Sequence, residues 1–377
     1  MARRFDIIHR ESLLLAGLIV VIAAFFSLTT FLAHAYHRKE GQFGRIWYRR
    51  GEQALQQSRP AEAVEDFRNA LAYSRDNDVY RLRLAQALMA DHRPQEARSH
   101  LLSLWEKEPG DGTLNLELAR LAAMWGDTRQ ALRYYHAAID GLWPDEPAAH
   151  RFQIRFELSE YLLQRRTVQD TKDAQAELVA LAGELPPQDA AEQTRLGTLL
   201  LEAGLYARAL AAFRAALADQ PNLMPALEGA SEAAFRMGEY RTARHFLLPI
   251  IAQNPRDESA LEMLNLSELV LKLDPLARGL PSQERVRRAV HDFQLALARA
   301  QKCTATAAPA SDSAVAVLLG QAKSIKPDEK VLARNPDAVE KTMDLVFKLE
   351  KTSVPCGPAG PEDKALGLLA QQWEASR

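Results

Sequence analysis

The sequence predicts an all-α fold: a right-handed solenoid of stacked antiparallel helix pairs, preceded by one transmembrane helix. The first indication is a skeleton that returns at a fixed spacing, because Ala209 and Phe213 are followed 34 residues later by Ala243 and Leu247. A constant period of this length indicates stacked repeats rather than one closed domain. The second indication is an uncharged apolar run over residues 12–36.

The composition agrees with a folded helical protein. Charged residues make up 25% of the chain and hydrophobic residues 47%, and the sequence is rich in Ala and Leu with few β-branched runs. The formal net charge is −2, and no basic stripe with interleaved aromatic residues is found. We therefore expect no nucleic-acid partner.

The N-terminal tail, residues 1–11, leads into the predicted transmembrane helix over residues 12–36. A helix of about 23 residues, rising about 1.5 Å per residue, spans roughly 34 Å and is long enough for a bilayer core. The alternative is a signal peptide cleaved after Ala33-His34-Ala35. The apolar run is longer than the usual h-region of such peptides, which favours an uncleaved anchor.

Basic residues flank the anchor on both sides, so the positive-inside rule favours neither orientation. Arg3, Arg4 and Arg10 precede the run, and Arg38 and Lys39 follow it. We place the protein in the inner membrane as a single-pass protein with an extracytoplasmic, periplasmic body. A cytoplasm-facing adaptor is the alternative.

The repeated region begins with three consecutive units in register. They carry Trp47, Gly51, Ala63, Phe67 and Ala70; Leu84, Ala85, Ala97, Leu101 and Pro109; and Leu118, Ala119, Gly126, Ala131, Tyr135 and Ala138. These residues resemble the tetratricopeptide repeat (TPR), whose pattern is W-x2-L-G-x2-Y, then A-x3-F, then P. The first unit departs from the pattern at Arg50 and Arg75. The resemblance covers residues 44–302 as about seven units and implies a TPR superhelix.

The fourth and seventh units are irregular. Ala131 and Ala174 are 43 residues apart, so we expect residues 165–172 to lengthen the turn inside the fourth unit. The fifth unit is the clearest, and the sixth follows in register. The seventh is interrupted at Asp274-Pro275 and resumes after Pro281 with Ser282, a good helix N-cap.

The remaining region, residues 303–377, is interpreted first as a helical cap on the solenoid and second as a partner-binding tail. A linker at 304–313 precedes three expected helices over residues 314–324, 336–351 and 361–373. Cys303 and Cys356 are either two unrelated buried thiols or one disulfide bond, which requires an oxidising compartment.

No catalytic or cofactor-binding motif is found, and no histidine stands at metal-ligand spacing from another. We therefore predict no enzymatic activity, no cofactor and no metal site. The sequence predicts instead a membrane-anchored scaffold for partner proteins, with a role in envelope assembly or secretion. The rival from another class is an accessory subunit of an enzyme complex that acts through the C-terminal region.

The resemblance implies that the first helix of each unit lines a concave groove for peptides or partner helices. The residues it places there are Tyr48, Glu52, Leu82, Gln86, Leu116, Arg120, Thr194, Thr198, Glu228, Glu232, Glu262 and Leu266. We call these the predicted inner positions. Among them only Arg120 matches the family's carboxylate clamp, so the clamp is not carried over. The alternative is that these residues are merely exposed.

Overall fold

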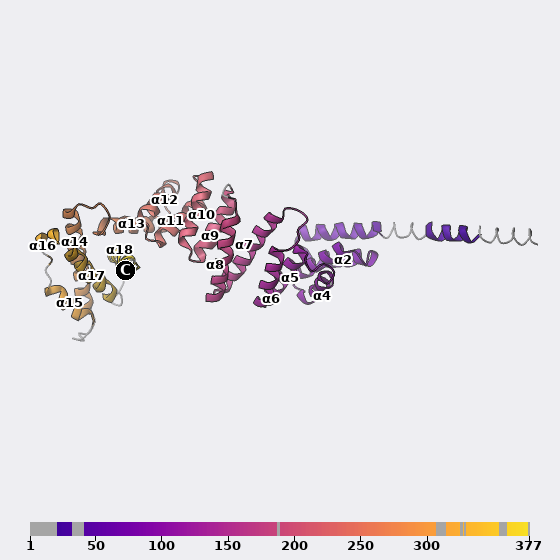
Figure 1. The fold of residues 1–377 in the computed structure, drawn as a ribbon, viewed down its shortest axis with the longest axis horizontal. Coiled ribbons are helices and arrows are strands. Elements are labelled where there is room, and N and C mark those ends of the chain that lie inside the picture. Colours follow the sequence, from indigo (N-terminus) through magenta and orange to yellow (C-terminus); the bar gives the residue numbers. More distant parts are fainter. Residues whose placement is uncertain are drawn as a thin grey trace, which may run out of the picture. The chain divides into compact units, whose positions relative to one another are not determined.

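The computed structural model describes residues 21–31, 41–186, 189–306, 314–324, 327, 329–353 and 360–375. Within these ranges every regular element is a helix, apart from one isolated bridge between Asp111 and Leu142. The all-α prediction is therefore confirmed for the described part of the chain. The chain divides into two compact units, Met1–Tyr161 and Leu162–Arg377, which are taken separately below (Figure 1).

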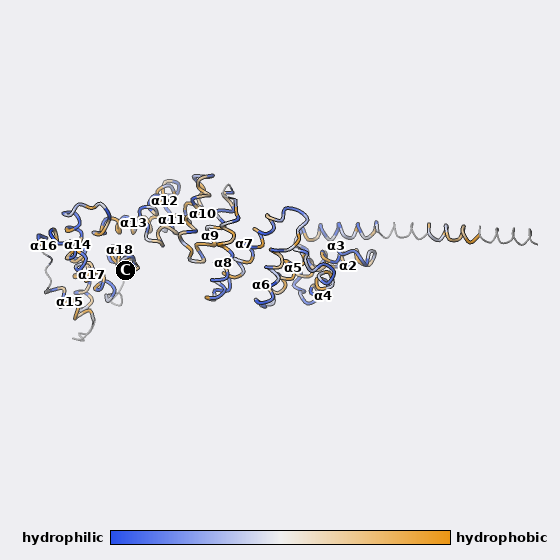
Figure 2. The backbone as a smooth tube through the Cα atoms, viewed as in Figure 1, coloured by the Kyte–Doolittle hydropathy of each residue, from blue (hydrophilic) through white to orange (hydrophobic). Residues whose placement is uncertain are grey.

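The predicted membrane segment is described only in part. Residues 21–31 form a helix whose large apolar side chains are exposed, from 51% for Val21 to 70% for Phe26, and this stretch is strongly hydrophobic in Figure 2. Residues 12–20 and 32–36 lie outside the described residues. Within the described ranges, no helix combines the length and the apolar character that crossing a bilayer requires.

The first unit consists of helix pairs joined by short turns. Its helices are residues 41–56, α2 (Pro60–Tyr73), α3 (Asp78–Ala90), α4 (Pro94–Trp105), α5 (Gly112–Met124), α6 (Thr128–Ile139) and the greater part of α7 (Pro147–Arg165). The side chains of Asn77, Asp111 and Asp127 accept hydrogen bonds from backbone N–H groups in the first turns of α3, α5 and α6. These caps satisfy donors that a helix leaves open and so fix where each helix begins.

The second unit continues the pairing and ends in a helical bundle. It contains α8 (Val168–Glu184), α9 (Ala190–Glu202), α10 (Tyr206–Asp219), α11 (Met224–Arg236), α12 (Tyr240–Gln253), α13 (Glu258–Leu273), α14 (Ser282–Thr306), α15 (Ala314–Ser324), α16 (Glu329–Arg334), α17 (Pro336–Ser353) and α18 (Pro361–Ala375). The helices α9 to α13 pack consecutively, each against the next. The break before α14 spans residues 274–281.

The expected long turn at residues 165–172 was wrong. α7 ends at Arg165 and α8 begins at Val168, so the turn is short and the extra residues lengthen the two helices. Thr167 caps α8 by accepting from the N–H of Asp170, and the Arg165 guanidinium pairs with the Asp170 carboxylate at 2.9 Å. These contacts let α8 begin at Val168, although the polar sequence of residues 165–172 predicts a turn.

An alanine recurs at the same position in the second helix of each repeat, and it is fully buried. Seven alanines have 0% exposure: Ala63, Ala97, Ala131, Ala174, Ala209, Ala243 and Ala289. Four residues later stands a large buried side chain, such as Phe67 or Phe213. A methyl group at the alanine lets the paired helices approach, and the larger side chain fills the space beside it.

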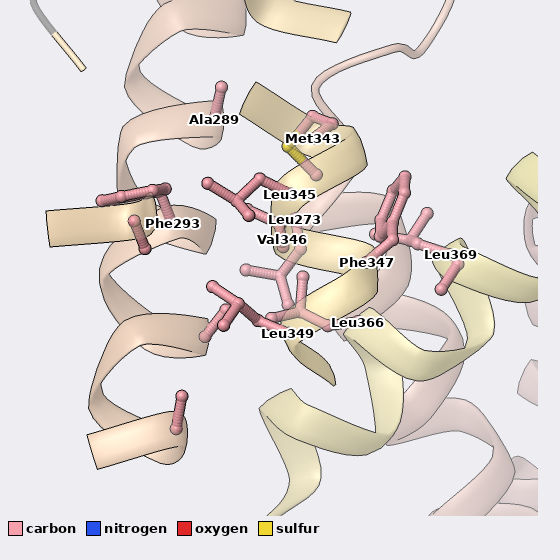
Figure 3. Close-up of a cluster of buried hydrophobic side chains, with 14 of the residues drawn as sticks. Leu273, Ala289, Phe293, Met343, Leu345, Val346, Phe347, Leu349, Leu366 and Leu369 are labelled. Carbon is pink, nitrogen blue, oxygen red and sulfur yellow. The ribbon is translucent and has the colours of Figure 1, made fainter. Parts of the chain in front are cut away.

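The bundle at the end of the second unit covers α13 and α14. α15, α16 and α17 pack on α14, while α18 packs on both α17 and α13. Figure 3 shows the shared apolar core, with Phe293 from α14, Val346 and Leu349 from α17, and Leu366 from α18. The short helix α16 was not predicted.

Cys303, on α14, is 4% exposed and is disulfide-bonded. Cys356 lies outside the described residues, so its pairing with Cys303 stays a prediction.

Ala209→Leu should destabilise the second unit by about 1–3 kcal/mol, because the added carbons overpack the contact between α9 and α10. The matched control is Ala211→Leu on the same helix, where the side chain is exposed. Thermal melts of both variants measure the effect. An unchanged midpoint for Ala209→Leu would show that the pair tolerates a larger residue.

A buried carboxyl group stands inside the C-terminal bundle without a hydrogen bond. Asp292 on α14 is 0% exposed, and neither of its oxygens has a partner among the described residues. Burial, reinforced by the nearby Asp274 carboxylate, raises the pKa of Asp292 to about 8. Near neutral pH the folded protein therefore holds a proton that the unfolded chain has released.

The stability of the bundle should fall as the pH rises from about 4, the ordinary pKa of aspartate, to about 8. Asp292→Asn removes this dependence, since the amide never ionises. The midpoint difference between Asp292→Asn and wild type should therefore grow from pH 5 to pH 8.5. Asp219→Asn, at an exposed site, serves as the control. A difference that stays constant with pH would contradict the assignment.

Candidate protein-binding surface

In the first unit the predicted inner positions lie on successive first helices. Tyr48 and Glu52 are on the helix of residues 41–56, Leu82 and Gln86 on α3, and Leu116 and Arg120 on α5. All six side chains are half-buried. The repeat thus places these three pairs of residues at equivalent positions on successive first helices.

The polar side chains among them are joined to one another. We call the following set the polar ladder: Glu52, Arg83, Gln86, Glu117, Arg120 and Glu157. Arg83 Nε lies 3.2 Å from the Glu52 carboxylate, and Arg83 Nη1 donates to Gln86 Oε1 at 2.9 Å. The ladder therefore links the helix of residues 41–56 to α3.

The ladder continues through α5 into α7. Gln86 Nε2 donates to Glu117 Oε1 at 2.8 Å, and Arg120 Nη1 donates to the same oxygen at 3.1 Å. Arg120 also binds both oxygens of Glu157, at 2.9 and 2.7 Å. Since each charge has an opposite charge or an amide beside it, the ladder couples four consecutive first helices.

Glu157 is the acceptor on which the far end of the ladder converges. The Tyr135 hydroxyl donates to its Oε1 at 2.9 Å. The Glu157 carboxylate raises the pKa of Arg120, while burial together with that carboxylate raises the pKa of Tyr135. Both groups therefore keep their protons at any physiological pH, so Arg120 stays a cation and the Tyr135 hydroxyl stays a donor.

The aromatic position at the start of the row serves packing. The Tyr48 ring stacks on Tyr80 with centroids 4.9 Å apart and meets Phe67 at 5.7 Å. Tyr48, Leu82 and Leu116 recur at 34-residue spacing, which predicts an apolar strip on this face. The structure places the three residues at equivalent points, with the charged ladder beside them, and a binding role for them stays a prediction.

In the second unit the predicted inner positions are more open. The hydroxyls of Thr194 and Thr198 donate to backbone carbonyls one turn earlier on α9. Glu232 on α11 forms an exposed pair with Arg236 at 3.2 Å, and Glu228 is exposed. These carboxylates are available to an incoming cation.

Farther along, α18 lies against the inner positions of α13. Lys364 Nζ is 2.9 Å from the Glu262 carboxylate, and a cavity of about 380 Å³ is lined by Leu266, Leu269 and Lys364 among others. Gln372 Nε2 donates to the carbonyl of Gly238 at 2.7 Å. Glu228, Glu232 and Glu262 stand at corresponding inner positions, which predicts an acidic patch. Lys364 of the chain's own C-terminal helix partly neutralises this patch at Glu262.

The residues that sequence reasoning missed are Arg83, Glu117, Glu157 and Lys364. Arg83 and Glu117 each follow a predicted inner position by one residue and stand 34 residues apart, so the same period could have found them. Glu157 lies in the irregular fourth unit, and no local signal placed α18 on α13.

Within the described ranges no group of three or more His, Cys, Asp or Glu side chains could hold a metal ion.

Two segments of this chain match a known repeat family. The tetratricopeptide repeat model matches residues 54–114 and 200–265. These two segments carry tetratricopeptide repeats. The first contains Leu82 and Gln86, and the second contains Glu228, Glu232 and Glu262, so predicted inner positions fall in both. A TPR fold is typically a non-catalytic scaffold for protein–protein interaction.

Several solved structures are similar to this chain. YrrB, a TPR protein with an unusual peptide-binding site, is 18% identical, with a TM-score of 0.40 over 52% of this chain and 97% of that chain. The C-terminal part of a TPR protein from Cytophaga hutchinsonii is 14% identical, with a TM-score of 0.45 over 60% and 86%. Pseudomonas aeruginosa pilF is 13% identical, with a TM-score of 0.42 over 59% and 97%. No curated protein matches the chain.

Arg120→Ala should destabilise the first unit by about 1–3 kcal/mol, because it leaves the Glu117 and Glu157 carboxylates without their shared cation. The control is Lys107→Ala, which removes an exposed pair with Asp78 at 2.7 Å in the same unit and should cost about 0–1 kcal/mol. Denaturant melts compare the two. Equal effects would mean that the ladder contributes no more than a surface pair.

Proposed function

We propose that this protein is a non-catalytic, membrane-anchored scaffold that binds partner proteins through the first helices of its repeats. The observation that carries the proposal is the accessible pair Glu228 and Glu232 on α11, in a segment that matches the repeat family. The two carboxylates lie one turn apart, so a partner can meet both. An acidic surface of this kind steers and retains basic segments.

The second unit suits this role better than the first. In the first unit, Glu52, Gln86 and Arg120 are already engaged in the polar ladder. A partner that binds there has to break hydrogen bonds within the protein before it forms its own. On α11, Glu228 makes no side-chain bond with any described residue, and the Glu232 pair is exposed and weak.

The membrane anchor is part of the proposal. Its support is the uncharged run over residues 12–36 and the exposure of every large apolar side chain between Val21 and Phe31. Such a surface in water is unfavourable, whereas lipid would cover it. We place the anchor in an inner membrane of a bacterial-type envelope, with a role in envelope assembly or secretion.

We also propose that the body lies outside the cytoplasm. The support is the disulfide bond at Cys303, since such bonds persist in oxidising compartments and are rare in the cytosol.

The tagged full chain, expressed in its own host and crosslinked before solubilisation, should retain a set of proteins that a fragment of residues 1–43 does not. The double variant Glu228→Lys, Glu232→Lys should lose those proteins while it keeps the wild-type melting midpoint, because like charges then repel the partner. Mass spectrometry identifies the proteins that each form retains, and a thermal melt gives the midpoint of the double variant.

The same preparations test location and side. The chain should stay in the pellet after carbonate extraction, and Cys303 and Cys356 should resist thiol labelling until a reductant is added. Release by carbonate would remove the anchor from the proposal. Free thiols would remove the extracytoplasmic body, and a protein set identical to that of residues 1–43 would remove the scaffold.

A further inference from the structure

The C-terminal helix α18 shows what kind of segment the first helices of this solenoid accept. Three of its residues, Lys364, Leu368 and Gln372, are four apart and so share one face of the helix. Lys364 pairs with Glu262 on α13, and Gln372 donates to the Gly238 carbonyl beyond α11. The chain thus carries a bound helix with a basic residue followed by an apolar one.

The surface under α18 has an equivalent one repeat earlier. α11 begins at Met224 and α13 at Glu258, 34 residues later, so Glu228 corresponds to Glu262. By the same spacing Phe235 corresponds to Leu269. Glu262 holds Lys364, whereas Glu228 is exposed and its carboxylate pairs with none of the described residues. α11 therefore presents a carboxylate, Glu228, at the position where Glu262 of α13 binds Lys364, but no cation of the described residues pairs with it.

A cavity with a mixed polar and apolar lining lies one turn along α11 from that acid, between α11, α13 and α18. It has a volume of about 450 Å³, and its walls carry the apolar side chains of Phe235, Met263 and Leu368 beside the polar Glu232, Arg236 and Gln371. Of the three apolar side chains, Phe235 and Met263 come from the repeats and Leu368 comes from α18. A branched or thioether side chain fits such a space, and the methionine can adapt its shape to it.

We infer that a helix of a partner protein docks on α11 beside α18, with a Lys or Arg on Glu228 and a Leu or Met four residues later in this cavity. The inference rests on the proposed scaffold function and deepens it by naming the partner's chemistry. The motivation for the pattern is α18 itself, where Lys364 and Leu368 have the same spacing. α18 is then one wall of the binding site as well as part of the terminal bundle.

The two contacts have different roles. The apolar side chain supplies affinity, because it leaves water to pack against Phe235, Met263 and Leu368. The basic residue supplies orientation and selectivity, since Glu228 is exposed and an exposed pair contributes little to affinity at physiological salt. A helix with an acidic residue in place of the base should be rejected.

The probe is a labelled synthetic peptide with the sequence of residues 360–375, titrated against the full chain in nanodiscs and followed by fluorescence anisotropy. It should bind saturably, and Glu228→Lys should weaken binding by about tenfold. A peptide with Lys364→Glu should bind wild type weakly and should recover on the Glu228→Lys chain. Glu362→Lys, an exposed charge change on α18 that lines neither cavity, is the matched control and should leave binding unchanged.

Two further variants separate the alternatives. In the full chain, Leu368→Glu should abolish binding of the peptide. The melting midpoint of this variant should stay near that of the wild-type chain, because Leu368 is only half-buried. If Glu262→Lys weakens binding and Glu228→Lys does not, the peptide replaces α18 at its own site and the inference is overturned. Equal binding to all variants overturns it as well. Partner capture that survives such a result would leave the scaffold function standing on another surface.

Discussion

The close approach of two helices at a buried alanine is the constraint on which this structure depends. At each such position there is no room for a larger residue, and the neighbouring large side chain closes the remaining space. Phe213 shows how far this reaches, since a Cβ added at either Gly197 or Gly229 would fall within 3 Å of its ring. One aromatic ring thus fixes the spacing of two consecutive first helices, α9 and α11. Each repeat is therefore stabilised by its contact with the next repeat.

Most of the helical architecture could be predicted from this constraint. The recurring small and large residues define the pairs, and the break after Leu273 follows from Asp274-Pro275. The fourth unit could not be predicted in the same way. Its polar residues 165–172 read as a turn, but Thr167 and the Arg165–Asp170 pair stabilise an early helix start. Capping by specific contacts overrides the composition there, and α16 is too short to carry a periodic signal.

The positions of the candidate surface residues could be predicted from the sequence, but the hydrogen bonds and ion pairs among them could not. The 34-residue period places Glu52, Gln86 and Arg120 on equivalent points of successive helices, yet it does not say that they bind one another. That depends on Arg83 and Glu117, one residue away on each helix. The period also says nothing of α18, which comes about a hundred residues after the helix it covers and outside the repeats.

The position of α18 limits how this solenoid can be lengthened. In an open-ended repeat protein, a further helix pair can be appended after the last one, because the end presents the same face as every interior repeat. Here α13 is already covered by α18, and α14 by α15, α16 and α17. A duplicated or designed repeat therefore has to enter upstream of α13, where both of its faces meet repeats, while the C-terminal bundle stays with its own helix pair.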